Sequence, residues 1–119
     1  MTGRVTLQKD MRQADFDAFA ALSGDANPIH VDPGFASRTR FGKTVAHGAY
    51  LCAIARGLVE QLAPGAVQLE QAVMFPNPAP AGETLDFTAE WTDGDRIAFS
   101  ARRASDGELC LTGHTQVQR

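Results

Sequence analysis

One short segment of the sequence combines an acid and an imidazole at a spacing that could do chemistry. Asp25 and His30 are five residues apart, and Asn27-Pro28 between them indicates a turn. A turn can bring both side chains to one point, where a carboxylate accepts protons and an imidazole exchanges them near neutral pH. Such a pair could hold and deprotonate one water molecule. The alternative is that both residues cap helices or shape the turn, and Asn27 is expected to brace the turn through local hydrogen bonds.

The elements that flank this segment are predicted to be helices, while the segment itself is expected to be a non-helical loop. Residues 13–23 form a helical pattern, and Gly24 suits the position just past its end. Its apolar face is predicted to consist of Phe16, Phe19 and Leu22. Asp32-Pro33 is typical of a helix start, with Asp as the N-cap, and predicts a short helix over residues 35–38.

The longest helical pattern runs from about residue 47 to residue 62 and carries one continuous apolar stripe. Pro64-Gly65 ends it. The stripe consists of Leu51, Ile54, Ala55, Leu58, Val59 and Leu62. A helix of this kind is predicted to be covered along that stripe by the rest of the chain.

After this helix the apolar period switches to two, which indicates strands. Alternating stretches cover residues 67–75, 84–91, 97–102 and 109–117, and residues 4–8 could add a short strand. Asp93-Gly94 and Asp106-Gly107 are hairpin turn signals, whereas the three prolines in residues 76–82 require a loop or a strand break. The pattern predicts an α+β fold, an antiparallel sheet wrapped around the long helix, as a single domain over residues 1–119.

Composition and charge narrow the function classes. A net charge of −3 gives no reason to expect nucleic-acid binding. No apolar stretch has membrane-spanning length and no signal-peptide core follows the N-terminus, so a cytoplasmic protein without a membrane partner is expected. Cys52 and Cys110 do not have metal-ligand spacing, and we expect two reduced core thiols and no metal site. His114, on an alternating strand, is expected at the surface.

The motif around Asp25 and His30 resembles that of MaoC-like dehydratases and (R)-specific enoyl-CoA hydratases. The core of the resemblance is Asp25-x-Asn27-Pro28-x-His30. It extends over roughly residues 16–85 through Asp32, Phe35-Ala36, Thr39, Phe41, Val45-x-His47-Gly48, Phe75-Pro76-Asn77-Pro78 and Gly82-Glu83-Thr84-Leu85. The resemblance implies a hot-dog fold, in which a sheet wraps around a central helix. It also implies a homodimer with the acyl site at the interface, which agrees with the open edges expected of a small sheet.

The activity implied by the resemblance is reversible syn addition of water to a trans-2-enoyl-CoA, giving the (3R)-hydroxyacyl-CoA. Asp25 and His30 would share the water. The N–H of Gly48, at the start of the long helix, would stabilise the enolate, as free N–H groups at a helix start can. The alternative for Gly48 is a packing glycine beneath the sheet. CoA is part of the substrate, and no further cofactor is implied.

Four residues are implied to contact the substrate: Asn27, Phe41, His47 and Ala49. His47 could instead hydrogen-bond the loop that carries Asp25, or cap the helix. Ala49 stands where the family commonly has Met, which predicts an altered acyl selectivity. A cationic cluster just before the long helix is a candidate for the CoA phosphates, or simply a solvated patch: Arg38, Arg40 and Lys43.

Three other functions remain open at this point. A hot-dog acyl-CoA thioesterase would share the fold but would need a water aimed at the thioester carbon. A non-catalytic acyl-thioester-binding subunit would not need intact Asp25 and His30. A dehydratase acting on acyl-carrier-protein substrates would differ only in the thiol carrier.

Overall fold

A computed structural model describes residues 2–118 and contains one five-stranded antiparallel sheet with the order β1-β3-β4-β5-β2. The side chains of the central strands alternate between the core and the outer face, as the period of two predicts. The strands are β1 (Arg4–Asp10), β2 (Val67–Met74), β3 (Thr84–Trp91), β4 (Arg96–Arg103) and β5 (Leu109–Gln118). β1 runs two residues beyond its predicted end and pairs with β3 along its whole length.

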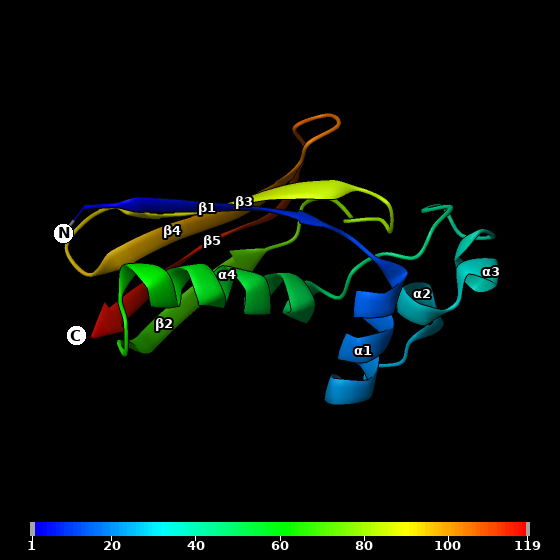
Figure 1. Cartoon of the computed structure of the whole chain (residues 1–119), viewed down its shortest axis with the longest axis horizontal. Coiled ribbons are helices and arrows are strands. Elements are labelled where there is room, and N and C mark those ends of the chain that lie inside the picture. The colour runs from blue at the N-terminus through cyan, green and yellow to red at the C-terminus, as the bar shows by residue number, and fades with distance from the viewer. Residues whose placement is uncertain (1, 119) are drawn as a thin grey trace.

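The long helix α4 (Gly48–Leu62) packs against the sheet (Figure 1). β2, at the far edge of the sheet, lies below α4 in this view, so the sheet curls around the helix. Four members of the predicted apolar stripe are buried, and the other two are half-buried. The buried four are Leu51, Ala55, Leu58 and Val59. Full burial of one such aliphatic side chain contributes about 1.5–3 kcal/mol, so this stripe holds α4 in place.

Three helices gather at the N-terminal end of α4: α1 (Gln13–Ser23), α2 (Pro28–Val31) and α3 (Pro33–Ala36) (Figure 1). α1 has its predicted bounds, and Gly24 ends it with φ +82°, a left-handed conformation that glycine adopts readily. The predicted apolar face of α1 was wrong at Leu22, which is 82% exposed. Only a narrow face of α1 meets the rest of the protein, and its buried residues are Phe16 and Ala20.

The prediction that residues 25–30 form a non-helical loop was also wrong in part, because His30 lies in the four-residue helix α2. Pro28 keeps only the preceding residue, Asn27, out of the helical region and itself occupies the first helical turn. The next helix is capped by Asp32, as predicted, but it begins at Pro33 and ends at Ala36. A helix of one turn is too short for apolar residues to recur at helical spacing, so a periodic pattern in the sequence cannot predict it.

The strand β2 departs most from its predicted pattern. Val67 and Leu69 were predicted to alternate into the core, yet they are 60% and 57% exposed. A register shift between Gln68 and Glu70 breaks the alternation, and β2 is an edge strand that pairs only with β5. His114 lies on the outer face of the sheet, beside Ala98 and Ala72 of the neighbouring strands, and is half-buried there, which agrees with the expected surface position. Within residues 2–118, no helix has the length and apolar character that crossing a membrane requires.

Candidate active site

Asp25 follows directly on the glycine that ends α1, in a turn held by its own side chains. The N–H of Asp25 donates to Ser23 Oγ (3.1 Å), and the N–H of Asn27 donates to Asp25 Oδ1 (3.3 Å). Asn27 Oδ1 in turn accepts from the N–H of Ile29 (3.1 Å) and caps α2. Asn27 therefore braces the turn, as expected, and leaves Asp25 Oδ2 directed at the next helix. The side chain of Asp25 is 55% exposed.

His30 faces Asp25 with one specific ring nitrogen. Its Nδ1 lies 2.7 Å from the carbonyl oxygen of Val45. A carbonyl oxygen only accepts hydrogen bonds, so Nδ1 carries the hydrogen and Nε2 has the free lone pair. Nε2 lies 4.0 Å from Asp25 Oδ2. This separation exceeds a direct hydrogen bond, but one water molecule at about 2.8 Å from each atom spans it.

His47 is the third side chain of the site. Its ring stacks on that of His30 with a centroid distance of 3.8 Å and an interplanar angle of 22°. Its Nε2–H donates to the backbone carbonyl oxygen of Asp25 (2.8 Å). His47 precedes α4, but its side chain makes no capping hydrogen bond. Of the two structural roles open to it, His47 therefore holds the loop that carries Asp25, and it is 2% exposed.

The segment 44–46, whose Val45 carbonyl accepts the hydrogen bond from His30, is itself held in place by further hydrogen bonds. The N–H of Val45 donates to the carbonyl of Ile29 (3.1 Å), so the two segments are bonded twice. On its other side the segment pairs with the loop that follows β2, through Ala46 N–H to Ala79 O (2.9 Å) and Ala81 N–H to Thr44 O (2.9 Å). The ring of His30 is thus anchored to the loop between β2 and β3 through one intervening segment.

A cavity of about 440 Å³ opens beside the start of α4. Gly48 lines it, and a backbone N–H at this first helical position has no partner within the helix. A Cβ on Gly48 would lie 2.8 Å from the Cζ of Phe75, so any larger residue here would require this ring to move. The other lining residues are Arg40, Phe41, Val45, Ala46, Leu51, Pro76, Asn77, Pro78, Ala79 and Cys110.

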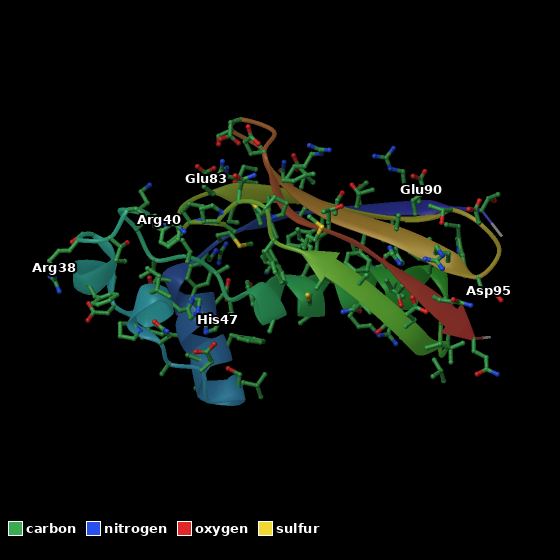
Figure 2. The ribbon with its side chains drawn as sticks, turned by 180° about the vertical axis from the view of Figure 1, so that it is seen from behind. Arg38, Arg40, His47, Glu83, Glu90 and Asp95 are labelled. Carbon is green, nitrogen blue, oxygen red and sulfur yellow. The ribbon has the colours of Figure 1, made fainter. Side chains whose placement is uncertain are left out.

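The predicted substrate-side residues divide between the cavity and its surroundings. Phe41 lines the cavity, and the guanidinium carbon of Arg40 lies 4.9 Å from the centre of its ring. Arg38 and Lys43 are exposed and do not line it. Figure 2 shows Arg38 and Arg40 at the same end of the molecule, far from Glu90 and Asp95. Ala49 is exposed and does not line the cavity.

The chain resembles known proteins along almost its whole length. The family described as MaoC like domain matches residues 2–108. The chain belongs to the MaoC-like family. It is 34% identical to an (R)-specific enoyl-CoA hydratase of Aeromonas caviae, over 97% of this chain and 91% of that one. It is 35% identical to a 3-hydroxybutyryl-CoA dehydratase of Methylorubrum extorquens, over 93% of this chain and 70% of that one.

Solved structures of MaoC-like proteins have the same fold as this chain. The unliganded R-hydratase of Pseudomonas aeruginosa superimposes with a TM-score of 0.87 at 25% identity, covering 98% of this chain and 79% of that one. The Aeromonas caviae (R)-hydratase involved in PHA biosynthesis gives a TM-score of 0.84 at 31% identity, covering 98% of this chain and 94% of that one. The predicted α+β hot-dog fold is thereby confirmed.

Burial raises the pKa of three side chains, two of them in α4 and one at the cavity wall. It raises the pKa of the Cys110 thiol, which lies at the cavity wall and donates to the carbonyl of Pro78 (3.3 Å). It also raises the pKa of Cys52. Burial, and then the negative charge of Asp15 and a hydrogen bond to it, raise the pKa of Tyr50. Both cysteines are free, as expected, although Cys52 is half-buried rather than a core residue.

Three side chains of the site could together offer ligands to a metal ion. One atom each of Asp25, His30 and His47 lies within 4.8 Å of the others. However, one nitrogen of each imidazole already donates to a backbone carbonyl. The only unpartnered buried side-chain nitrogen or oxygen found in residues 2–118 is Nδ1 of His47. A metal-free site stays a prediction of the sequence.

Sequence reasoning brought together Asp25, His30 and His47 but did not assign the wall opposite Gly48. Phe75 and Asn77 belong to it, and the amide of Asn77 donates to the carbonyl of Leu109 (2.9 Å), which fixes this loop to β5. The signal was present in the segment from Phe75 to Pro78, whose prolines and aromatic residue were recognised as part of the resemblance without a role in the site.

Proposed function

We propose that this MaoC-like chain is an (R)-specific enoyl-CoA hydratase, which adds water reversibly and syn to a trans-2-enoyl-CoA to give the (3R)-hydroxyacyl-CoA. The names of its hydratase and dehydratase relatives support a hydro-lyase. The observation that carries the proposal is the pairing of a free imidazole nitrogen, His30 Nε2, with Asp25 Oδ2 at 4.0 Å. That spacing suits a water held between a base and a carboxylate.

The proposed reaction uses three groups of the chain. His30 Nε2 takes a proton from the water, which Asp25 orients, and the water oxygen forms a bond to C3. The π electrons of the C2–C3 bond move toward the thioester oxygen, and the resulting enolate accepts a hydrogen bond from the N–H of Gly48. The acid–base pair then returns one proton to C2 from the same face. His30 carries the proton between the two steps, and both side chains are back in their starting protonation states after the full cycle, so the proposed reaction requires no further cofactor.

The cavity beside Gly48 is proposed to take the thioester and the adjoining part of the CoA arm. Its walls are mostly apolar, and Arg40 adds a positive charge on the side of Phe41. A cation there suits the phosphates of CoA. Arg38 and Lys43, which are close to Arg40 in the sequence, are both exposed to solvent. The same groups would suit the phosphate of an acyl-carrier-protein arm, so the carrier is assigned to CoA on the relatives' names.

We further propose that the whole chain, residues 1–119, acts as one cytoplasmic domain and assembles into a homodimer. A dimer is supported by the edge of the sheet at β2. This strand and the residue that follows it carry exposed apolar side chains, and within residues 2–118 one side of the strand has no neighbouring strand to pair with its backbone. These side chains are Val67, Leu69, Met74 and Phe75. A partner at this edge would also lie close to the cavity, which Phe75 lines.

The test is a hydration assay with trans-2-enoyl-CoA substrates of several chain lengths, following loss of the enoyl-thioester absorbance and determining product chirality. Asp25→Asn and His30→Gln should each lower kcat by roughly 10²–10⁴-fold while circular dichroism stays that of a folded protein. Asp86→Asn, which changes an exposed carboxylate on the outer face of β3, is the matched control. Wild-type kcat in either site variant would refute the paired assignment, and release of free CoA without hydration would identify a thioesterase.

A further inference from the structure

A hydrogen-bonded pair outside the acid–base site connects the segments that hold His30. The Oγ1–H of Thr44 donates to Gln13 Oε1 (2.6 Å). The Nε2 of the same Gln13 amide donates to the backbone carbonyl of His30 (2.8 Å) and to Asp17 Oδ1 (3.0 Å). Thr44 is 2% exposed, and Gln13 is half-buried at the start of α1. One side-chain amide thus bonds both the residue that bears the imidazole and a buried hydroxyl.

His30 depends on such external bonds because its own helix is too short to be stable. α2 has four residues, and a single helical turn does not form without tertiary support. The carbonyl of Val45 holds the imidazole ring of His30, and Gln13 holds the backbone carbonyl of His30. Thr44 directly precedes Val45, so Gln13 links the segment 44–45 to the backbone of His30. We call this set of hydrogen bonds, among Gln13, His30 and the segment 44–45, the clamp.

The clamp sets the direction of His30 Nε2. If α2 shifts against the segment 44–45, the bond from Nδ1–H to Val45 weakens, and the nitrogen that carries the hydrogen is no longer specified. The separation of 4.0 Å between Nε2 and Asp25 Oδ2 changes as well. A misplacement of about 1 Å in a reacting group can lower a rate on the order of 100-fold.

We propose that Gln13 and Thr44 are positioning residues for His30, fixing its orientation and the nitrogen that carries its proton. Neither residue belongs to the motifs by which the sequence resembles its family, and neither lines the cavity. The inference rests on the proposed role of His30 as the base. It extends the site to the start of α1, 17 residues before His30, and to Thr44, 31 residues after Gln13.

The experiment compares variants that differ in one hydrogen-bonding group. Thr44→Val removes the hydroxyl at nearly constant shape, and Gln13→Met removes both amide groups at similar length. Each should lower kcat about tenfold and leave KM within about twofold. Thr44→Ser restores the donor and should keep kcat within about twofold of wild type. Asp17→Ala removes only the exposed partner of Gln13 and is the matched control, with wild-type kcat expected.

A spectroscopic measurement separates positioning from general damage. In protein labelled with ¹⁵N-histidine and measured at alkaline pH, His30 should be a single tautomer with hydrogen on Nδ1. Thr44→Val and Gln13→Met should give a mixture of tautomers, and Thr44→Ser should not. The double variant Thr44→Val/Gln13→Met should be no slower than about the slower single variant, since both changes break one connection.

The possible failures are distinguishable. If His30→Gln abolishes hydration but Thr44→Val and Gln13→Met keep wild-type kcat or a single His30 tautomer, the positioning role is wrong and the proposed function stands. Equal losses in Thr44→Ser and Thr44→Val would also overturn it, because the hydroxyl would then not matter. If His30→Gln retains full activity, the catalytic assignment fails, whatever the Gln13 variants do.

Discussion

Replacing Gly48 with alanine tests whether this position lacks a side chain because of Phe75 or because of the substrate. An added Cβ would lie 2.8, 3.0 and 3.1 Å from three atoms at the far end of the Phe75 ring. Phe75 is 47% exposed, so the ring can turn away from the new methyl group. Overpacking a closed core costs about 1–3 kcal/mol, and we expect a loss near the lower end of this range. The melting temperature should fall by only a few degrees, roughly 3–5 °C.

The effect on rate should be much larger than the effect on stability. The methyl group leaves the N–H of residue 48 in place but occupies space that the thioester oxygen needs for close approach. Loss of one oxyanion donor lowers kcat by about 10²–10³-fold, and we expect a decrease of this order. The assay measures kcat and KM for hydration of one good enoyl-CoA beside thermal unfolding of the same preparation.

The double variant Gly48→Ala/Phe75→Ala decides between the two reasons. Removing the ring relieves the contact, so the stability lost through Gly48→Ala should return relative to the single variant Phe75→Ala. The rate should stay low relative to that same single variant. Recovery of the full Phe75→Ala rate in the double variant would refute the oxyanion role and make Gly48 a packing residue beneath Phe75.

Four further predictions concern selectivity, assembly, thiol reactivity and metal dependence. Ala49 is exposed and does not line the cavity of the single chain, so it can contact the acyl group only if the partner subunit of the proposed homodimer encloses it. Ala49→Met should then change relative kcat/KM among short, medium and branched enoyl-CoAs at least tenfold, because a methylene in an apolar pocket is worth roughly 1–3 kcal/mol. Equal effects on all substrates would place residue 49 outside the acyl pocket. Light scattering at micromolar concentration should give a homodimer, and Leu69→Lys on the exposed edge of β2 should weaken it; a fully active monomer would contradict the dimer. Burial raises the pKa of Cys110 and so lowers its thiolate fraction at pH 8, so iodoacetamide should label folded Cys52→Ser protein far more slowly than the unfolded chain. Prolonged treatment with EDTA should leave kcat unchanged, and a loss restored by one divalent ion would establish a metal at Asp25, His30 and His47.

The elements that the sequence predicted well are those whose environment repeats along the chain. α4 meets the sheet along one face for its whole length, so its apolar residues recur at helical spacing. β3 and β4 are flanked on both sides, and their alternation is unbroken. β2 has a neighbour on one side only and a register shift, so alternation in sequence no longer means alternation in burial. α2 is a single turn set by a cap and a proline, which no period can reveal.

For the site, the sequence predicted the residues with distinctive chemistry but not the contacts that orient them. Asp25 and His30 are close in the chain and belong to a recognisable motif. Gln13 and Thr44 carry common side chains, and their importance arises from bonds across 17 and 31 residues. Phe75 likewise meets Gly48 only through the fold. Spacing cannot display such contacts, because they depend on how α1, α4 and the loop after β2 come together.

The stacked imidazole rings of His30 and His47 link the loop that carries Asp25 to the segment before α4. His30 donates to the carbonyl of Val45, and His47 donates to the carbonyl of Asp25, so each ring ties down a segment that the other does not. Two imidazolium ions with centroids 3.8 Å apart would repel each other, whereas one beside a carboxylate is stabilised. In the proposed reaction Asp25 provides that carboxylate when His30 accepts a proton, while His47 keeps its hydrogen bond to the carbonyl of Asp25. His47 therefore both holds the loop that carries Asp25 and directly precedes Gly48, which couples the acid–base pair to the start of α4 where the enolate would be bound.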